Sequence, residues 1–375
     1  MSNSMNPKFI LYFSIIFAAI VVFSGIYFGL PLWLVDDEPP YILAALKMIQ
    51  LKTMLPVFHL EDFKPFLYYP PYLSYLYLPF FTLIVAIKYF LLNGSLERLT
   101  YVIAADSSIF FLVARLVVLI LSLSGLVIIY KICLRLWGNT VKAVLSAFFL
   151  ATSFSYLALS MNSRHWLPVT FIFLVTLYFL SNDKLKLEKR YFFATLMLGI
   201  GVGVNVISAL GILLLPLWYL LYDKNSFHSV IKNPFIYFLI LFFIVLAYLP
   251  LLIFPGSLGF SGSVDFIGKS FAGLLSSPIN FLMPIILVEP ILIFWAVIGI
   301  LFAIKKRERT LLIFFCIMVF YSTIFYFVFY LTHRFTLPLL PFLVSFAGYG
   351  FYELWFLLSG FDDRQNRIWM KAKPF

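Results

Sequence analysis

The sequence has few charged residues, only two cysteines and no sizeable soluble domain. Asp, Glu, Lys and Arg make up 11% of the 375 residues, hydrophobic residues make up 63%, and the mean hydropathy is +1.03. Soluble domains carry roughly 25% charged residues, so this composition excludes one. The two cysteines, Cys133 and Cys316, lie within or beside apolar runs, which excludes a disulfide framework. The sequence therefore predicts a polytopic membrane protein.

The abundant residues are those that face lipid. The chain has 46 Phe and 23 Tyr, whose rings fill apolar volume, and the Tyr hydroxyl favours headgroup depth. Long apolar runs recur along the whole chain, which favours an all-α bundle. They cover about 9–35, 66–92, 108–130, 143–160, 166–181, 191–222, 234–254, 281–303, 310–331 and 335–357.

Basic residues predict which connections are cytoplasmic. The net charge is +11, from 27 Lys and Arg against 16 Asp and Glu, and most of the excess lies in the connections 131–142, 182–190 and 304–309 and in the tail 360–375. Cytoplasmic loops are enriched in Lys and Arg, so the charge requires no nucleic-acid partner. These connections all fall inside if 66–92 lies on or dips into the outer leaflet without crossing.

The run 191–222 also has to be divided. Its 32 residues would make one helix of roughly 48 Å, against a hydrocarbon core of about 30 Å. Gly199, Gly201, Gly203 and Asn205 lie near its middle, where glycine weakens a helix. Two short spans here give about ten spans in one domain covering 1–375. Both termini and the tail 360–375 are then cytoplasmic, and 36–107 is the first outer loop.

The segment 36–71 is the only long polar interruption, and it opens with three consecutive carboxylates. Charge next to a membrane span is costly, so a function should be sought for it. The predicted topology brings further charged residues to the same outer face, where cations can hold a phosphate and a carboxylate can accept a proton. The outer set is Asp36, Asp37, Glu38, Glu61, Asp62, Arg115, Arg164, His165, His333 and Arg334.

An ordered series of segments then resembles a known family. Residues 37–44 read D-E-x-x-Y-x-x-A and residues 69–76 read Y-P-P-Y-L-x-Y-L. Three later segments agree with the same order: A-R-L at 114–116 before a span ending in R-L-W-G, A-F-F-L-A-T-S at 147–153, and H-R-F-T-L-P-x-x-P at 333–341. Together they resemble glycosyltransferases of the GT-C fold, most of all the protein O-mannosyltransferase and aminoarabinose-transferase branch. The resemblance implies juxtamembrane helices in the first outer loop.

The resemblance also implies a chemistry. The donor is a polyprenyl-phosphate sugar, and an acceptor hydroxyl attacks the anomeric carbon with inversion while phosphate leaves. Asp37 matches the family's first-loop aspartate and would be the general base, with Glu38 beside it. Arg334 and His333, with Arg115 and Arg164, would bind the donor phosphate. The supporting residues are Asp36, Tyr41, Glu61, Asp62, His165 and Glu289.

Several residues have a structural alternative. Asp36 and Asp37 could simply cap the helix that begins at the prolines 39–40, and Arg334 could extend to the interface. Arg115, some residues inside its run, could pair with the equally buried Glu289. The turn at His165 carries no acidic residue, unlike many relatives, so Glu61 or Asp62 would have to supply any second carboxylate.

Cofactor, partners and location are less constrained. Arg and His can stabilise a monophosphate leaving group, so no cofactor or metal is required, although the three adjacent carboxylates could hold Mg²⁺ or Mn²⁺. The acceptor is a protein, lipid or glycan, and mannose, glucose, galacturonic acid and aminoarabinose all stay open as the sugar. A prokaryotic plasma membrane is the expected location.

Two rival functions stay open. A transporter would also show many spans, and the half-helices 191–204 and 206–222 would line its site. Against this, no matching broken pair is predicted in the other half of the chain, and the polar residues gather at one surface. A non-catalytic relative that binds lipid phosphate is the other rival.

Overall fold

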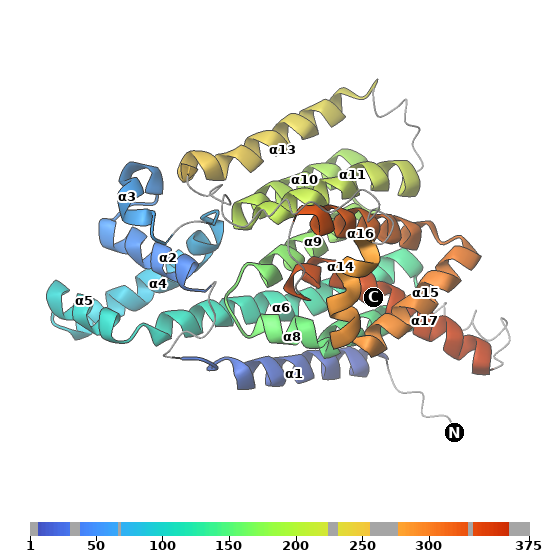
Figure 1. Ribbon diagram of the computed structural model, residues 1–375, viewed down its shortest axis with the longest axis horizontal. Helices are drawn as coiled ribbons and strands as arrows, with labels where there is room; N and C mark the ends of the chain where they lie inside the picture. The colour runs from blue at the N-terminus through green and yellow to red at the C-terminus, as the bar shows by residue number, and fades with distance from the viewer. Residues whose placement is uncertain are drawn as a thin grey trace.

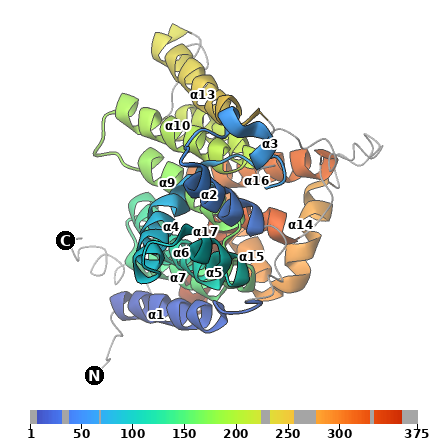
Figure 2. The ribbon, with the colours of Figure 1, turned by 90° about the vertical axis from the view of Figure 1, so that its left-hand side faces the viewer.

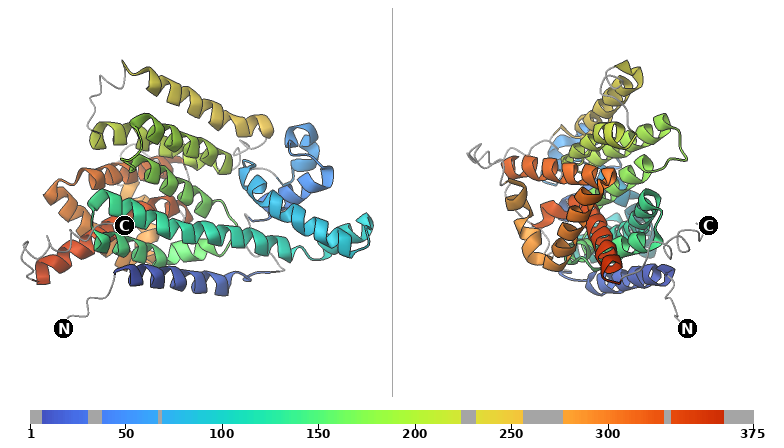
Figure 3. Two further views of the ribbon diagram at one scale, coloured as in Figure 1. Left: turned by 180° about the vertical axis from the view of Figure 1, so that it is seen from behind. Right: turned by 90° about the vertical axis from the view of Figure 1, so that its right-hand side faces the viewer.

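The computed structural model describes residues 7–30, 38–66, 69–223, 232–255, 277–328 and 333–359, with the backbone alone at 325–328 and 333. Every element in these residues is a helix, which confirms the all-α prediction. The long helices run roughly along the long axis of the molecule (Figure 1), with α1 along one long side and α13 along the other (Figure 3). Between them lies a continuous core of buried aliphatic and aromatic side chains.

The first half of the chain contains one group of helices set apart from the bundle. Helices α2 to α5 lie together at one end, on the left of Figure 1 and toward the viewer in Figure 2; we call this the α2–α5 end. The elements of this half are α1 Pro7–Gly25, α2 Pro39–Leu51, η1 Pro56–His59, α3 Leu60–Phe63, α4 Tyr72–Leu91, α5 Leu96–Ala105, α6 Ser108–Trp137, α7 Thr140–Thr152, α8 Phe154–Ser160 and α9 Trp166–Leu180.

The second half completes the bundle with helices that are more often interrupted. Its elements are α10 Leu187–Val204, η2 Val206–Leu213, α11 Leu214–Leu217, η3 Trp218–Tyr222, α13 Pro234–Ile253, α14 Ser277–Val288, α15 Pro290–Lys306, α16 Arg309–Val328, η7 His333–Leu339 and α17 Leu340–Ser359. Short 3₁₀ or π segments, such as η2, η3 and η7, interrupt apolar runs that would otherwise form continuous α-helices.

The predicted break in the run 191–222 is confirmed. Helix α10 ends at Val204, and the Oδ1 atom of Asn205 accepts a hydrogen bond of 3.0 Å from the backbone of Ile207. This capping bond favours a new helical segment in place of continuation. Gly203 has a packing reason as well, because a Cβ atom there would lie 2.0 Å from the ring of Tyr72 on α4.

Two further breaks were not predicted. The run 143–160 bends by 59° between α7 and α8 at Ser153, and the run 281–303 is divided between α14 and α15 at Glu289, directly before Pro290. Proline has no N–H and disfavours helical backbone in the residue before it, which explains the second break. The break at Ser153 lies in the other half of the chain from the break at Asn205, so the expectation of no matching break there was wrong, and that argument against a transporter no longer holds.

Apolar helices long enough to cross a membrane are numerous in the described part of the chain. By length and composition five helices qualify, or up to seven if each bent pair is one span. Helix α4 is among the five, yet it lies with α2, α3 and α5 at the end of the bundle (Figure 1). The chain is thus an integral membrane protein; the count of about ten spans and the leaflet position of 66–92 stay predictions.

Helices α15 and α17 approach each other at two glycines. A Cβ atom at Gly299 would lie 2.0 Å from the carbonyl oxygen of Phe346, and one at Gly350 would lie 2.4 Å from the backbone nitrogen of Gly299. Small residues allow this backbone contact, which is typical of packed membrane helices.

Candidate functional site

A fully buried ion pair lies where the α2–α5 end joins the bundle. The carboxylate of Glu38, the residue before α2, accepts hydrogen bonds of 2.9 and 2.6 Å from Nε and Nη2 of Arg115 on α6. The two side chains are 0% and 1% exposed. Such bidentate geometry adds directional hydrogen bonds to the charge attraction, which offsets the large cost of burying both ions.

The same pair reaches two more segments. Arg115 Nη1 donates to the carbonyl oxygens of Ile26 and Phe28 after α1, each at 2.7 Å. Glu38 also accepts from the backbone nitrogen and hydroxyl of Ser163, at 2.6 and 3.1 Å. The pair therefore joins the end of α1, the start of α2, helix α6 and the turn before α9.

These contacts decide one alternative that the sequence left open and identify the N-cap of α2; the capping role considered for Asp36 and Asp37 lies outside the described residues. Arg115 pairs with Glu38 and not with Glu289, whose Oε1 atom instead accepts from the Ser153 hydroxyl and the Ser155 backbone nitrogen at 2.7 and 2.9 Å. The N-cap position of α2 is Glu38, and its side chain makes no capping bond. The N-terminal turn of α2 is thus supported by Pro39 and Pro40, which have fixed φ angles and no N–H groups there.

His165 lies at the centre of an aromatic cluster beside this ion pair. Its Nδ1 atom shares a hydrogen bond of 2.8 Å with the hydroxyl of Tyr41 on α2. The rings of Tyr69 and Trp166 lie 5.0 and 4.5 Å from the imidazole, and Tyr69 stacks on Tyr41 at 5.4 Å. The start of α2, the segment before α4 and the turn before α9 therefore meet at one histidine.

Two arginines lie next to His165. Arg164 precedes it in the chain, and Arg334 comes from η7, whose Phe335 ring packs edge-on against Trp166 at 4.9 Å. Burial lowers the pKa of His165 well below its ordinary value of 6.5, and the positive charges of Arg164 and Arg334 lower it further. His165 is therefore neutral at pH 7. The side chains of Arg164 and Arg334 are half-buried.

Other predicted site residues lie elsewhere or outside the described part. Glu61 and Asp62 are on α3 with side chains 91% and 44% exposed, where Glu61 is 4.0 Å from Lys64 and Asp62 is 3.1 Å from Lys47. Asp36, Asp37 and the side chain of His333 fall outside the described residues. Of the predicted set, the structure brings together Glu38, Tyr41, Arg115, Arg164, His165 and Arg334.

Sequence reasoning missed three contributors to this cluster. Ser163 binds Glu38, and Tyr69 and Trp166 enclose His165. Tyr69 and Trp166 both stand in segments that had been singled out, but no spacing rule predicts which aromatic ring meets a histidine far away in the chain.

No group of three potential metal ligands occurs among the described residues. Glu38, one of the three adjacent carboxylates considered for a divalent ion, already binds Arg115 and Ser163. Metal ligation by Glu38 would require breaking these bonds within a buried site.

The comparisons with known proteins agree with this architecture. Residues 79–254 match the sequence profile of the dolichyl-phosphate-mannose-protein mannosyltransferase family. The matched part includes Arg115 and the Arg164–His165 turn but not α2 or η7. The sequence has no significant match among curated proteins.

Solved structures match over almost the whole chain. ArnT from Cupriavidus metallidurans bound to undecaprenyl phosphate aligns at a TM-score of 0.58 and 13% identity, over 96% of this chain and 61% of that one. The Archaeoglobus fulgidus oligosaccharyltransferase in the apo form aligns at 0.60 and 14%, over 100% and 53%. The archaeal oligosaccharyltransferase AglB from Archaeoglobus fulgidus, in complex with an inhibitory peptide and a dolichol-phosphate, aligns at 0.56 and 12%, over 98% and 52%.

These likenesses define the class of the molecule. The chain is an all-helical membrane protein with the GT-C fold seen in ArnT and AglB. It spans about half to three-fifths of the length of those solved proteins, 52% to 61%.

Proposed function

We propose that the chain is a membrane glycosyltransferase that moves a sugar from a polyprenyl-phosphate donor to an acceptor hydroxyl. The observation that carries the proposal is the meeting of Arg164, His165 and Arg334 directly beside the anchored start of α2. Two arginines, half-buried beside a neutral histidine, form a site suited to a phosphate. The family match at 79–254 and the GT-C fold support the same reaction class.

Arg164 and Arg334 would bind the donor phosphate. A sugar phosphate gains negative charge as the glycosidic bond breaks, and fixed guanidinium groups stabilise that charge most when little water is present. Neutral His165 can add a hydrogen bond without a third positive charge, and Tyr41 fixes its ring orientation. His333 adjoins Arg334 in the chain and stays a second candidate for this role.

Asp37 would be the general base that accepts the proton of the acceptor hydroxyl. It directly precedes Glu38, so its Cα lies about 3.8 Å from that of an anchored residue. Both oxygens of Glu38 already have partners, and so do both terminal nitrogens of Arg115, of which Nη2 binds Glu38 and Nη1 binds the carbonyl oxygens of Ile26 and Phe28. We therefore assign Glu38 and Arg115 to positioning Asp37, in place of catalysis and phosphate binding.

The guanidinium groups would make a divalent cation unnecessary for departure of the phosphate. We propose that transfer continues in the presence of EDTA. Dependence on added Mg²⁺ or Mn²⁺ would instead assign Asp36 and Asp37 to metal binding.

The decisive experiment measures sugar transfer by the purified protein in lipid. A panel of labelled polyprenyl-phosphate sugars is supplied with water and a membrane extract as acceptors. Asp37→Asn should lower turnover by about 100-fold or more, the usual contribution of a general base, while donor binding is kept. Asp106→Asn is the matched control, because Asp106 belongs to the same predicted loop, is exposed after α5 and is not among the candidate site residues. Equal turnover in wild type and Asp37→Asn would contradict the base assignment.

The proposed face of the reaction is the non-cytoplasmic side, where the α2–α5 end would lie. Single cysteines replacing Glu97 on α5 and Lys186 before α10, both exposed, test this with a membrane-impermeant thiol reagent. Labelling in intact cells should occur at position 97 and not at 186. The reverse pattern would place the site on the cytoplasmic side.

A transporter is the second candidate, because helix breaks occur at both Asn205 and Glu289. It predicts flux of a lipid-phosphate sugar across proteoliposomes with no consumption of the donor. Flux that survives Asp37→Asn, in protein that shows no transfer, would favour this function.

A further inference from the structure

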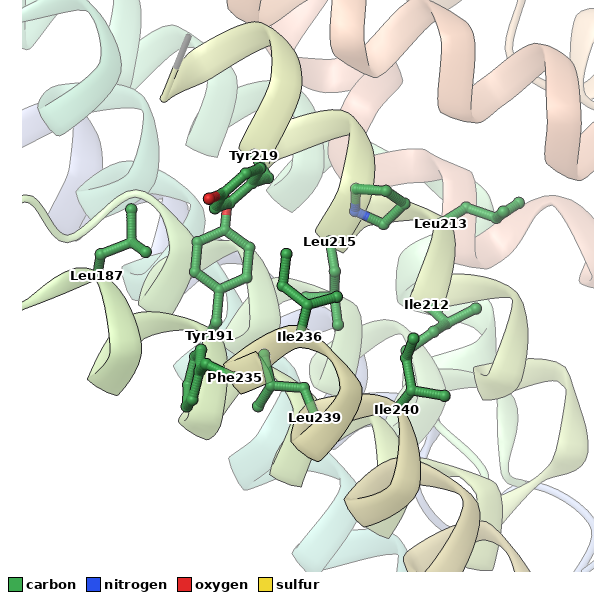
Figure 4. A pocket seen from close by; sticks show the side chains of 11 residues that line it. Leu187, Tyr191, Ile212, Leu213, Leu215, Tyr219, Phe235, Ile236, Leu239 and Ile240 are labelled. Atoms are coloured by element: carbon green, nitrogen blue, oxygen red, sulfur yellow. The ribbon is translucent and has the colours of Figure 1, made fainter. Parts of the chain in front are cut away.

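An apolar groove lies between α10, the segments η2 to η3 and α13. It has a volume of ≈ 280 Å³, and Figure 4 shows aliphatic side chains and the rings of Tyr191, Tyr219 and Phe235 around it. Leu187 marks one end of the groove, while Ile212 and Ile240 lie toward the other. Such a surface is suited to a hydrocarbon chain and to no polar ligand.

Helices α10 and α13 bound the groove on two sides. They touch at Gly199, where a Cβ atom would lie 2.5 Å from the Cβ of Leu246. The groove lies nearer the beginning of both helices, because its lining includes Leu187 of α10 and Phe235 and Ile236 of α13, together with residues of η2 to η3. The end of the groove at Leu187 and Phe235, which we call its mouth, is therefore where the two helices begin.

This mouth is remote from the candidate active site. Gly203, sixteen residues after Leu187 on the same helix, contacts Tyr72 at the α2–α5 end. At 1.5 Å per residue the two points are about 24 Å apart, close to the thickness of a hydrocarbon core. A lipid whose headgroup lies at the mouth is therefore in the leaflet opposite the proposed donor.

Positive charge surrounds the mouth. Lys184, Lys186 and Lys189 at the start of α10 and Lys232 before α13 are all exposed, as is Glu188. Two other acidic side chains nearby, Asp183 and Asp223, are paired with Arg190, at 3.2 and 2.7 Å. The lysines are thus in excess, and lysines beside a membrane attract anionic lipid headgroups.

We propose that this groove holds one acyl chain of an anionic glycerophospholipid, with its phosphate among Lys184, Lys186, Lys189 and Lys232. The bound lipid is distinct from the sugar donor and fills the space between α10, α13 and the segments η2 to η3. It stabilises the α10–α13 pair by covering apolar side chains, in proportion to the area covered.

Photocrosslinking tests the site. Phosphatidylglycerol and phosphatidylcholine carrying the same diazirine-labelled chain are incorporated separately into nanodiscs with the full chain, and crosslinked peptides are mapped. Phosphatidylglycerol should label the peptides that contain 212–219 and 235–240 several-fold more than phosphatidylcholine does. Equal labelling by the two lipids would overturn the proposal, because the groove would then hold any chain.

Variants separate the chain site from the charge site. Ile236→Trp should fill the groove and reduce labelling by both lipids, whereas Ile244→Trp, on the same helix with residue 244 55% exposed to lipid, should leave it unchanged. Replacing the four lysines by Gln should remove the preference for phosphatidylglycerol and keep labelling by phosphatidylcholine. This second variant keeps the test valid if Ile236→Trp fails to fold.

Competition distinguishes the proposed lipid from the donor. Unlabelled phosphatidylglycerol should reduce the labelling, and undecaprenyl phosphate at the same concentration should not. Stronger competition by undecaprenyl phosphate would assign the groove to the donor chain and refute the proposal, without affecting the transfer assay of Asp37→Asn.

Discussion

The two ends of the bundle handle charge differently. At the α2–α5 end, Arg115 and Glu38 are 1% and 0% exposed and bind each other and the surrounding backbone. At the opposite end, Glu353 on α17 binds Lys142 and Lys306, and Lys306 is 46% exposed. A buried pair loses far more when one partner is removed than an exposed pair does. The first end therefore has a fully buried pair, whereas the second has a nearly buried Lys142–Glu353 pair, 12% and 6% exposed, with a partly exposed Lys306 beside it.

The largest expected effect is at the buried pair. Arg115→Ala should lower the free energy of unfolding by about 3–5 kcal/mol, because Glu38 would be left as an unpaired buried charge. Thermal unfolding in detergent, with chemical denaturation for the free energy, measures this. The double variant Glu38→Leu/Arg115→Met should be more stable than either single change. A loss in Arg115→Ala no larger than that in Lys306→Ala would refute the contrast between the ends.

An intermediate effect is expected at the opposite end. Glu353→Ala should cost about 1–3 kcal/mol, the usual contribution of hydrogen bonds to charged groups. Lys142 would lose its carboxylate partner but keep its positions over the rings of Tyr349 and Tyr352, at 4.2 and 4.9 Å. The same unfolding assay applies, and Glu353→Gln should lose less because it retains an acceptor oxygen.

A pH-dependent effect is expected at His165. Because burial lowers its pKa in the folded chain, the unfolded chain binds a proton below about pH 6.5 that the folded chain does not. This contribution to stability is complete above that pH and declines as the pH falls below it. His165→Gln should therefore flatten the acid side of a plot of melting temperature against pH. His59→Gln, on exposed η1, is the control and should leave the curve unchanged.

The smallest effect should come from Lys306, the partly exposed partner of Glu353. Lys306→Ala should cost less than about 1 kcal/mol, since solvent screens the pair and Lys142 still binds Glu353. Added salt should reduce the difference further. If Lys306→Ala instead lowered the free energy of unfolding by about 3 kcal/mol or more, as expected for Arg115→Ala, the charges at this end would be as well shielded from solvent as those at the α2–α5 end.

Composition and local patterning predicted the class of fold well. Hydropathy located the apolar runs, and the glycines before Asn205 located one break, since both signals are local in sequence. The breaks at Ser153 and Glu289 were missed because each run stayed apolar across them. Pro290 was a usable signal for the second, and it was overlooked.

The candidate site was only partly predictable. Family resemblance selected Glu38, Arg115, Arg164 and Arg334, and the structure brings them to one region. Their pairing depends on which faces of distant helices meet. Arg115 was therefore expected to bind phosphate, with Glu289 as the alternative partner, whereas it binds Glu38, 77 residues away. Single-sequence patterns carry no information on that register.

The glycine contact between α15 and α17 has a mechanical consequence. With their backbones touching at Gly299 and Gly350, the two helices cannot slide past each other without a steric clash, so they move as one rigid body. Arg334 lies on η7, which leads directly into α17, whereas α14 is separated from α15 by the break at Glu289. Any rearrangement that repositions Arg334 around a substrate through α17 must therefore carry α15 along.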